Sequence, residues 1–359
     1  MKVGILGGGQ LARMLALAGH PLGLKFVVLD PAPDACSGVV AEHIVGAYDD
    51  PQKLKIFAEK VDIVTYEFEN VPAESVRYLT NKLPVYPSPD ALAFSRDRLR
   101  EKTMFRELGI ATPEFFAVNS LEDLEEAVQK IGLPAILKSR TLGYDGKGQF
   151  LLKKKEVLPA AWEQLAGVPC ILESFVSFSR EISIIAARAC NGETVFYPVS
   201  ENVHRSGILH LSTCRSDDPM QKAAESYSKL LLDKMEYVGV LALELFHSDG
   251  ALLANEIAPR VHNSGHWTID GAHTSQFENH LRAVLGLPLG DTSAYGHCAM
   301  VNFVGQIPHS KDVLAIKNAH FHDYGKEPRL SRKIGHGTVC SQREDEFRSS
   351  LEQLLALVS

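Results

Sequence analysis

The sequence predicts an α/β protein of two or three domains, because of its length, its composition and the alternation of strands and helices near its N-terminus. The chain has 359 residues, and a domain usually holds roughly 150. Hydrophobic residues make up 45% of the chain and charged residues 23%, the composition of an ordinary globular protein. Strands that alternate with helices indicate a parallel sheet covered by helices.

The alternating pattern occupies the first ninety-odd residues. Three short apolar runs predict strands, at Lys2–Leu6, Lys25–Leu29 and Asp62–Thr65. Helical patterns lie at Leu11–Leu17 and from Ala73 onward. The run Tyr86-Pro87-Ser88-Pro89 ends this unit, and Asp90–Leu108 is then predicted to be helical.

The middle of the chain, roughly residues 96 to 295, changes to apolar strands that are close enough in sequence to pair antiparallel. Such strands are expected at Ala135-Ile136-Leu137, Ile171-Leu172 and Ile182–Ala187. A helical segment, Gln221–Tyr237, precedes two strands, Gly239–Phe246 and Ala251–Glu256. Asp249-Gly250 between alternating apolar runs predicts a hairpin. From about residue 296 we expect short strands, a basic turn at Tyr324–Lys333 and a closing helix, Glu344–Leu357.

Charge and cysteine spacing exclude several classes of protein. Acidic residues outnumber basic ones by 44 to 37, for a net charge of −7, whereas nucleic-acid binders present a basic surface. No apolar run approaches the roughly 18 residues that cross a bilayer, and the N-terminal run lacks a cleavage site. The six cysteines have no metal-ligand spacing, which predicts free thiols in a reducing cytosol. We therefore expect a cytoplasmic protein that binds neither nucleic acid nor membrane.

The glycine-rich segment Gly7–Ala12 follows a predicted strand and opens a helix. It fits the pattern G-x-G-x-x-A, and Asp30 ends the next strand at about the right distance for a ribose contact. A helix N-terminus with small residues also suits other anions. A dinucleotide, another phosphate ligand and a bare structural turn therefore stay open as interpretations.

Two further segments are suited to a nucleotide. Lys138 ends an apolar strand and precedes a loop with three glycines, Gly143–Gln149, in which backbone N–H groups and lysine charge can meet a polyphosphate. The spacing differs from a Walker A loop, so a solvated hairpin tip is an equal alternative. A later strand ends in Glu173 and continues extended through Ser174-Phe175-Val176, where backbone groups can meet a purine edge and Glu181 the ribose. Solvated acids beside a strand are the commoner case.

Two acids on the predicted hairpin are the most informative feature. Glu244 lies on one strand and Glu256 on the next, with Asn255 beside it. Both carboxylates can face the same side, and hard oxygen ligands suit Mg²⁺ bound to ATP phosphates. Because their neighbours are apolar, unpaired carboxylates would be costly here. The loop 258–268 adds a guanidinium, two imidazoles, an amide and a hydroxyl, which a reactive phosphoanhydride would need; in a generic loop such groups are solvated.

In this order the features resemble the ATP-grasp superfamily, and within it the N5-carboxyaminoimidazole ribonucleotide synthetases. The resemblance rests on the segments GGGQLARML, VTYEFENVP, GYDGKGQ, LLANEIAPRVHNSGHWT and YGKEPRLSRKIGH, and it covers nearly the whole chain. It implies a three-domain ATP-grasp fold and a homodimer. The domains would be a preATP-grasp parallel α/β domain at 1–95, an ATP-grasp α+β module at 96–295 with a mobile lid at about 115–180, and a small C-terminal domain at 296–359.

The resemblance also implies the site residues. The ATP shell would be Arg98, Lys138, Gly143, Tyr144, Asp145, Gly146, Lys147, Gly148, Gln149, Glu173, Ser174, Phe175, Val176, Glu181, His204, Asn255 and Glu256. The substrate would contact Gln10, Tyr144, Asp145, His262, Asn263, Lys326, Arg332 and Lys333. Glu244 and Glu256 would bind Mg²⁺, as two ions that Mn²⁺ could replace, and the catalytic residues would be Arg260, His262 and Asn263. One departure is Leu330-Ser331, where the family often has Pro-Gly or a further basic residue, which leaves the path of that turn open.

The implied activity is that of an ATP-dependent carbon–nitrogen ligase of purine biosynthesis. ATP, as cosubstrate, would phosphorylate bicarbonate to carboxyphosphate, which carboxylates the 5-amino group of 5-aminoimidazole ribonucleotide and releases ADP and phosphate. One alternative is another ligase of the superfamily, such as the formate-using glycinamide ribonucleotide transformylase. A dinucleotide-dependent oxidoreductase would leave Glu244 and Glu256 without a role. A non-catalytic nucleotide sensor would have no use for both acids.

Overall fold

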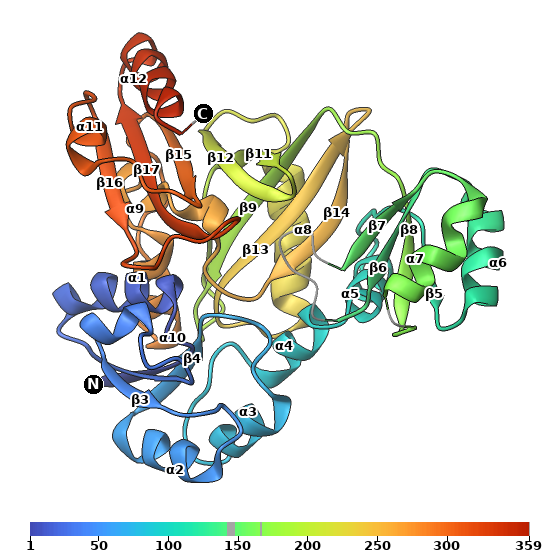
Figure 1. The fold of residues 1–359 in the computed structure, drawn as a ribbon. Coiled ribbons are helices and arrows are strands. Elements are labelled where there is room, and N and C mark those ends of the chain that lie inside the picture. The colour runs from blue at the N-terminus through green and yellow to red at the C-terminus, as the bar shows by residue number, and fades with distance from the viewer. Residues whose placement is uncertain (142–147, 166, 359) are drawn as a thin grey trace.

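The computed structural model describes residues 1–141, 148–165 and 167–358 (Figure 1). Their strands form three sheets, one of nine strands and two of four. The predicted residues Gly143–Lys147 lie outside the described part of the chain. No helix in the described part is both long and apolar enough to cross a membrane.

The N-terminal sheet is parallel, as predicted, with the strand order β3-β2-β1-β4. Its strands are β1 (Lys2–Leu6), β2 (Lys25–Asp30), β3 (Glu42–Val45) and β4 (Ile63–Tyr66). The helices of this segment are α1 (Gln10–Gly19), α2 (Pro51–Lys60), α3 (Ala73–Thr80) and α4 (Pro89–Ser95), with 3-10 turns η1 (His20–Leu22) and η2 (Cys36–Val39). The carboxyl ends of β1 and β4 therefore lie side by side, which places the glycine turn beside the segment after β4.

The single helix predicted over Asp90–Leu108 is wrong, because the structure has two helices there, α4 and α5 (Arg98–Glu107). Asp97 separates them, and its carboxylate accepts the backbone N–H groups of Leu99 and Arg100 at 3.0 and 3.4 Å. This cap starts a new helix, since an Asp side chain satisfies N–H groups that have no partner within the helix. Helix α5 then runs between the two sheets described next.

A small antiparallel sheet, which we call the lid sheet, has the order β5-β8-β6-β7. Its strands are β5 (Phe115–Val118), β6 (Ala135–Ser139), β7 (Gln149–Leu152) and β8 (Cys170–Ser174). Helices α6 (Leu121–Ile131) and α7 (Leu158–Gln164), with η3 (Lys155–Val157), cover its outer face at one end of the molecule (Figure 1). Leu124, Val128 and Leu172 are buried between helices and sheet.

The nine-stranded central sheet has the order β14-β13-β9-β11-β12-β15-β17-β16, with β10 paired to β9. Its strands are β9 (Arg180–Arg188), β10 (Thr194–Phe196), β11 (Val199–Arg205), β12 (Ile208–Arg215), β13 (Gly239–Ser248), β14 (Ala251–Ala258), β15 (His297–Val304), β16 (Ala319–Asp323) and β17 (Lys333–Ser341). The associated helices are α8 (Gln221–Lys234), η4 (Asn263–Gly265), α9 (Thr268–Gly271), α10 (Gln276–Val284), α11 (Ser310–Leu314) and α12 (Glu344–Ala356). The β13–β14 hairpin turns at Asp249-Gly250 as predicted.

Two of the three C-terminal strands differ from expectation, because β15 and β17 have eight and nine residues and are not short, whereas β16 has five. They also continue the central sheet, since β12 pairs antiparallel with β15, Leu211 opposite Val301. The boundaries 1–95, 96–295 and 296–359 stay a prediction.

Helix α10 joins the N-terminal sheet to the central sheet. The Nδ1 of His280 accepts the backbone N–H of Val240 at 3.1 Å, so Nε2 bears the proton and donates to Thr65 Oγ1 at 2.8 Å. Burial lowers the pKa of His280 to about 4, which keeps the ring neutral. Through these two bonds, His280 connects β4 of the N-terminal sheet with β13 of the central sheet.

Candidate active site

Glu244 and Glu256 are direct partners across the β13–β14 hairpin. The register shifts just after this pair, where Leu245 faces Ala254, so Asn255 is the extra residue of a β-bulge. Side chains directly opposite in an antiparallel pair lie on one face, with Cβ atoms about 5 Å apart. The two carboxylates therefore project side by side, as the predicted hairpin requires.

Each acid has a nitrogen partner at about hydrogen-bond distance. Glu244 Oε1 lies 3.1 Å from Nε2 of His262, and Glu256 Oε2 accepts a hydrogen bond of 3.0 Å from Arg98. Burial raises the pKa of Glu244, but the hydrogen bond and charge of His262, with the charges of His204 and Lys333, outweigh it and lower the pKa to about 2. Glu244 is ionised at neutral pH, so this pair fits a divalent cation that prefers carboxylate oxygens.

Arg260 lies in the loop after β14 and is bound by Glu69, from the segment after β4. The guanidinium donates two hydrogen bonds to that carboxylate, 2.6 Å from Nε and 3.4 Å from Nη2. Burial lowers the pKa of Arg260, but the charges of Glu69, Glu256 and Glu67 outweigh burial and raise it. The guanidinium is therefore within electrostatic reach of Glu256 in the carboxylate pair and of Glu67 at the N-terminal glycine turn.

The loop from His262 to Ser264 is fixed by side chains around it. His262 Nδ1 lies 2.9 Å from Ser264 Oγ, and Gln276 binds both the backbone N–H and the carbonyl of His262, at 2.9 and 2.6 Å. Asn263 exchanges two amide hydrogen bonds with Asn302, at 3.0 and 2.7 Å. These bonds hold His262 and Asn263, two of the three predicted catalytic residues, in place.

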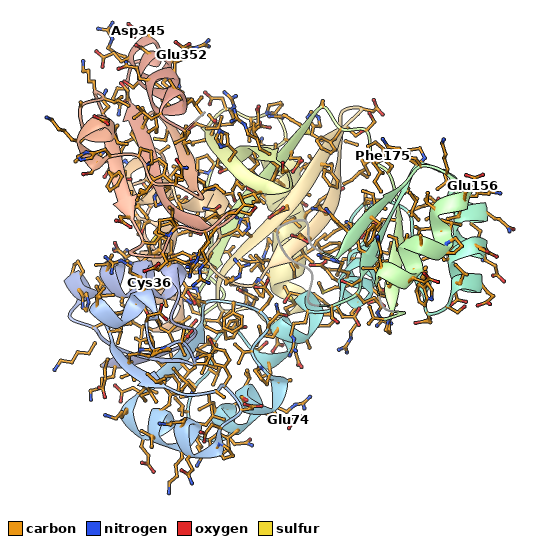
Figure 2. The ribbon with its side chains drawn as sticks, viewed as in Figure 1. Cys36, Glu74, Glu156, Phe175, Asp345 and Glu352 are labelled. Atoms are coloured by element: carbon orange, nitrogen blue, oxygen red, sulfur yellow. The ribbon has the colours of Figure 1, made fainter. Side chains whose placement is uncertain are left out.

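The predicted ATP residues lie on two facing surfaces, the lid sheet and the central sheet. Lys138 is the next-to-last residue of β6, and its Nζ lies 3.0 Å from Oε2 of Glu173 on β8. Gly148 has a left-handed φ of +70°, and Gln149 then pairs with Lys138 across β6–β7. Phe175 follows β8 on the connection toward the central sheet and is 46% exposed (Figure 2).

The predicted ribose acceptor lies on β9, next to the carboxylate pair. Glu181 Oε2 is 2.7 Å from Nδ1 of His204 on the neighbouring strand β11. Burial opposes protonation of His204, but the hydrogen bond and charge of Glu181 raise its pKa overall. Glu244 adds to this effect, so Glu181 and His204 share one charged region with the carboxylate pair.

The predicted substrate residues meet from opposite ends of the chain. Lys326 donates from Nζ to Gln10 Oε1 at 2.9 Å, across 316 residues of sequence. Arg332 donates to the backbone carbonyl of Glu327 at 3.1 Å, and Lys333 begins β17. In the turn at Leu330-Ser331, Ser331 has a left-handed φ of +62°, a conformation that glycine adopts more readily than serine.

Asp30 does not extend toward a ribose but braces the glycine turn. Its carboxylate accepts the backbone N–H of Gly8 at 2.8 Å and the hydroxyl of Tyr48 at 2.8 Å. Glu67 accepts the N–H groups of Gly9 and Ala12, so this helix N-terminus already has its own anion. Among the three interpretations of the segment, the structural turn is favoured.

The sequence reasoning missed four site residues. Glu69 holds Arg260, and Gln276 holds the backbone of His262. Lys102 donates to the carbonyl of Ala254 at 3.0 Å, and Glu101 accepts the N–H of Ile257 at 2.7 Å. Burial and the charge of Glu256 raise the pKa of Glu101 to about 8. Charged residues on the apolar face of a predicted helix were an available signal for Glu101 and Lys102.

Asp270, His322 and His336 form a cluster with one ligand atom each within 4.8 Å of the others. The two imidazole rings are stacked at 4.3 Å with an angle of 12° between their planes. Their nitrogen lone pairs therefore lie in nearly parallel, separate planes and do not meet at one ion. His322 instead binds Asp270 at 2.7 Å, which fixes α9 to β16.

The antiparallel lid sheet carries Lys138 and Glu173 and faces the carboxylate pair on the central hairpin. This arrangement defines the protein as an ATP-grasp enzyme. Family models agree with the fold over three segments. A ribonucleotide synthetase preATP-grasp domain matches residues 1–96, an ATP-grasp domain residues 103–277, and a phosphoribosylaminoimidazole carboxylase C-terminal domain residues 298–350.

Similarity to individual proteins identifies the family within the ATP-grasp enzymes. The N5-carboxyaminoimidazole ribonucleotide synthase of Pseudomonas aeruginosa is 56% identical over 358 residues, which cover 100% of this chain and 99% of the relative. The crystal structure of the synthetase from Thermus thermophilus has a TM-score of 0.96 and 52% identity, covering 99% and 98% of the two chains. The Aspergillus clavatus enzyme, solved with ADP and 5-aminoimidazole ribonucleotide, has a TM-score of 0.92, 29% identity and coverage of 99% and 98%. The chain belongs to the N5-carboxyaminoimidazole ribonucleotide synthase family of ATP-dependent ligases.

Proposed function

We propose that this protein uses ATP and bicarbonate to carboxylate the 5-amino group of 5-aminoimidazole ribonucleotide, releasing ADP and phosphate in purine biosynthesis. The observation that supports it best is the position of Arg260. Its guanidinium is held by Glu69 and lies within electrostatic reach of both Glu256 and Glu67. A cation in this position suits an anionic intermediate. The intermediate would form beside the nucleotide and then react with the substrate.

Bicarbonate is a poor electrophile and needs activation. Lys138 and Arg98 would hold the phosphates of ATP while the γ-phosphoryl group moves to a bicarbonate oxygen, which gives carboxyphosphate and ADP. Mg²⁺ held by Glu244 and Glu256 would offset the charge on the phosphates. Arg260 and Asn263 would orient the carboxyphosphate, because charged and amide donors fixed in advance stabilise an anion without reorganisation.

The second step forms a carbon–nitrogen bond. Carboxyphosphate delivers its carboxyl carbon, or the CO₂ that it releases, to the substrate amine, and phosphate leaves. The amine loses a proton in this step, and we propose His262 as its acceptor, since an imidazole is the usual general base near neutral pH. Gln10 and Lys326 would bind the ribonucleotide on the opposite side of the site.

The test is a coupled assay of ADP release in bicarbonate buffer, with 5-aminoimidazole ribonucleotide added or omitted. We expect ADP release that depends on both compounds. Release that depends on formate and glycinamide ribonucleotide would instead support the transformylase. Binding of NADPH, followed by its fluorescence, would revive the oxidoreductase interpretation.

Three further expectations belong to this proposal. Mg²⁺, with Mn²⁺ as a substitute, is supported by the ionised Glu244 and by Glu256 directly opposite it. A homodimer and a cytoplasmic location follow from the family resemblance and the cysteine usage. Sedimentation of the purified protein tests the dimer.

A further inference from the structure

We propose that Lys102 is a positioning residue for nucleotide binding. It acts as the permanent counter-ion of Glu173, so that Lys138 can leave this carboxylate and bind the phosphates of ATP. This inference rests on the proposed function, because it takes Lys138 as a phosphate ligand.

Two lysines share one carboxylate oxygen at the base of the lid sheet. Lys138 Nζ lies 3.0 Å from Oε2 of Glu173, and Lys102 Nζ lies 3.5 Å from the same atom. The side chain of Glu173 is 3% exposed and that of Lys102 is 1% exposed, against 12% for Lys138. Lys138 is therefore the cation nearer to the solvent, where a nucleotide would arrive.

The other oxygen of Glu173, Oε1, is buried and has no hydrogen-bond partner among the described residues. The compensation of this charge therefore depends on the two ammonium groups at Oε2. Burial raises the pKa of Glu173, but Lys102 and Lys138 outweigh it and lower the pKa to about 2. Burial lowers the pKa of Lys102, and the charge of Glu173 opposes that shift. If Lys138 were the sole counter-ion, its movement to a phosphate would leave a buried carboxylate unpaired, which is strongly unfavourable.

Lys102 is suited to remain in place. Besides Glu173, it binds the carbonyl of Ala254 at 3.0 Å, directly before the bulge residue Asn255 and the proposed metal ligand Glu256. Lys102 lies on α5, between the lid sheet and the central sheet, so it also connects the end of β8 with the strand of the carboxylate pair. One lysine thus balances the charge on the lid side and fixes the backbone on the metal side.

The experiment compares Lys102→Met, Glu173→Gln and the double variant with the wild-type chain. Binding of Mg–ADP is measured by titration calorimetry, and KM is measured for ATP and for 5-aminoimidazole ribonucleotide. We expect Lys102→Met to weaken Mg–ADP binding and raise the KM for ATP by about 10- to 100-fold, the usual range for residues that support a ligand through another. The KM for the ribonucleotide should change less than about twofold. Lys229→Met is the matched control, because Lys229 is 59% exposed and pairs only on the surface of α8 with Asp233.

The double variant separates charge balance from a merely structural role. Once Glu173→Gln has removed the carboxylate, adding Lys102→Met should weaken nucleotide binding by less than about threefold, since coupled residues do not act additively. Full additivity, unchanged binding in Lys102→Met, or an equal rise of both KM values would overturn the inference. If Lys102→Met does not fold, the double variant against Glu173→Gln gives the same test without an orphaned charge. Calorimetry with Mg–ADP tests the role of Lys102 independently of the proposed reaction. If the proposed reaction is wrong, the wild-type chain will show no turnover.

Discussion

Arg260 and Glu69 are 191 residues apart in sequence, and their side chains form a bidentate ion pair at the junction of the N-terminal and central sheets. Both are mostly buried, at 18% and 23% exposure. Burial raises the pKa of Glu69, but the charge and hydrogen bond of Arg260 outweigh it and lower the pKa. Arg–carboxylate pairs with two parallel bonds fix orientation as well as charge, so Glu69 sets the direction in which Arg260 points.

Glu69→Gln should therefore reduce kcat by about 10- to 100-fold, as loss of a supporting residue usually does. The amide keeps the shape of the carboxylate but loses its charge, and the guanidinium can turn away from the intermediate. The KM for ATP should change little. Glu74→Gln is the control, because Glu74 lies on the outer surface of α3 (Figure 2) and is 84% exposed. Equal activity of the two variants would contradict the assigned role of Glu69.

The carboxylate pair predicts a change in metal dependence. Replacing Glu244 or Glu256 with glutamine removes one charged oxygen ligand, and the Mg²⁺ concentration for half-maximal rate should rise at least about tenfold. Glu59→Gln, on an exposed side chain of α2, should leave the Mg²⁺ curve unchanged. An unchanged curve in both hairpin variants would place the metal elsewhere.

Local patterns were sufficient to predict the elements that determine the site. The hairpin of β13 and β14 follows from alternation on both sides of Asp249-Gly250, and the parallel sheet follows from strands that alternate with helices. Helix ends were less accurate, because capping decides them: Asp97 begins α5 inside a run that otherwise has a helical pattern. The sequence pattern alone does not distinguish an acid that caps a helix from one that faces solvent.

Contacts between distant segments were not predictable in this way. The pairing of Glu69 with Arg260, of Lys326 with Gln10 and of β12 with β15 depends on how the sheets are brought together. Asp30 shows the same limit, because its place after a strand suggested a ribose ligand while its real partners are Gly8 and Tyr48. Such contacts depend on tertiary packing, which periodicity does not encode.

His262→Ala tests the proposed base. The ring is fixed between Glu244 and Ser264, and its removal takes away the proton acceptor while the ATP shell on the lid sheet stays in place. We expect kcat to fall by about 10²- to 10⁴-fold, the usual contribution of general acid–base catalysis, with a much smaller change in the KM for ATP. An unaltered kcat would end this assignment.

Lys326→Met tests the substrate side. Lys326 is held by Gln10, and burial, with the charge of Arg332, lowers its pKa. Loss of the ammonium should raise the KM for 5-aminoimidazole ribonucleotide at least about tenfold, as expected for a charged hydrogen bond of about 1.5–3 kcal/mol, and leave Mg–ADP binding unchanged. Lys311→Met on α11 is a control, because this exposed lysine lies outside the proposed site. Weaker Mg–ADP binding in Lys326→Met would show that the residue belongs to the nucleotide side.

Glu173 predicts how stability depends on pH. Its folded-state pKa of about 2 lies below the ordinary value of 4.5, so the unfolded chain binds more protons at this residue between these values, and stability rises with pH across that range. The stabilisation, about 3 kcal/mol, is complete above about pH 5 and is lost as the pH falls toward 2. In thermal unfolding from pH 7 to pH 3, Glu173→Gln should melt below the wild-type chain at neutral pH, and the gap should narrow below pH 5. The exposed variant Glu59→Gln should show no such convergence. A gap between Glu173→Gln and the wild-type chain that stays constant to pH 3 would mean that Lys102 and Lys138 do not hold this carboxylate in its ionised form.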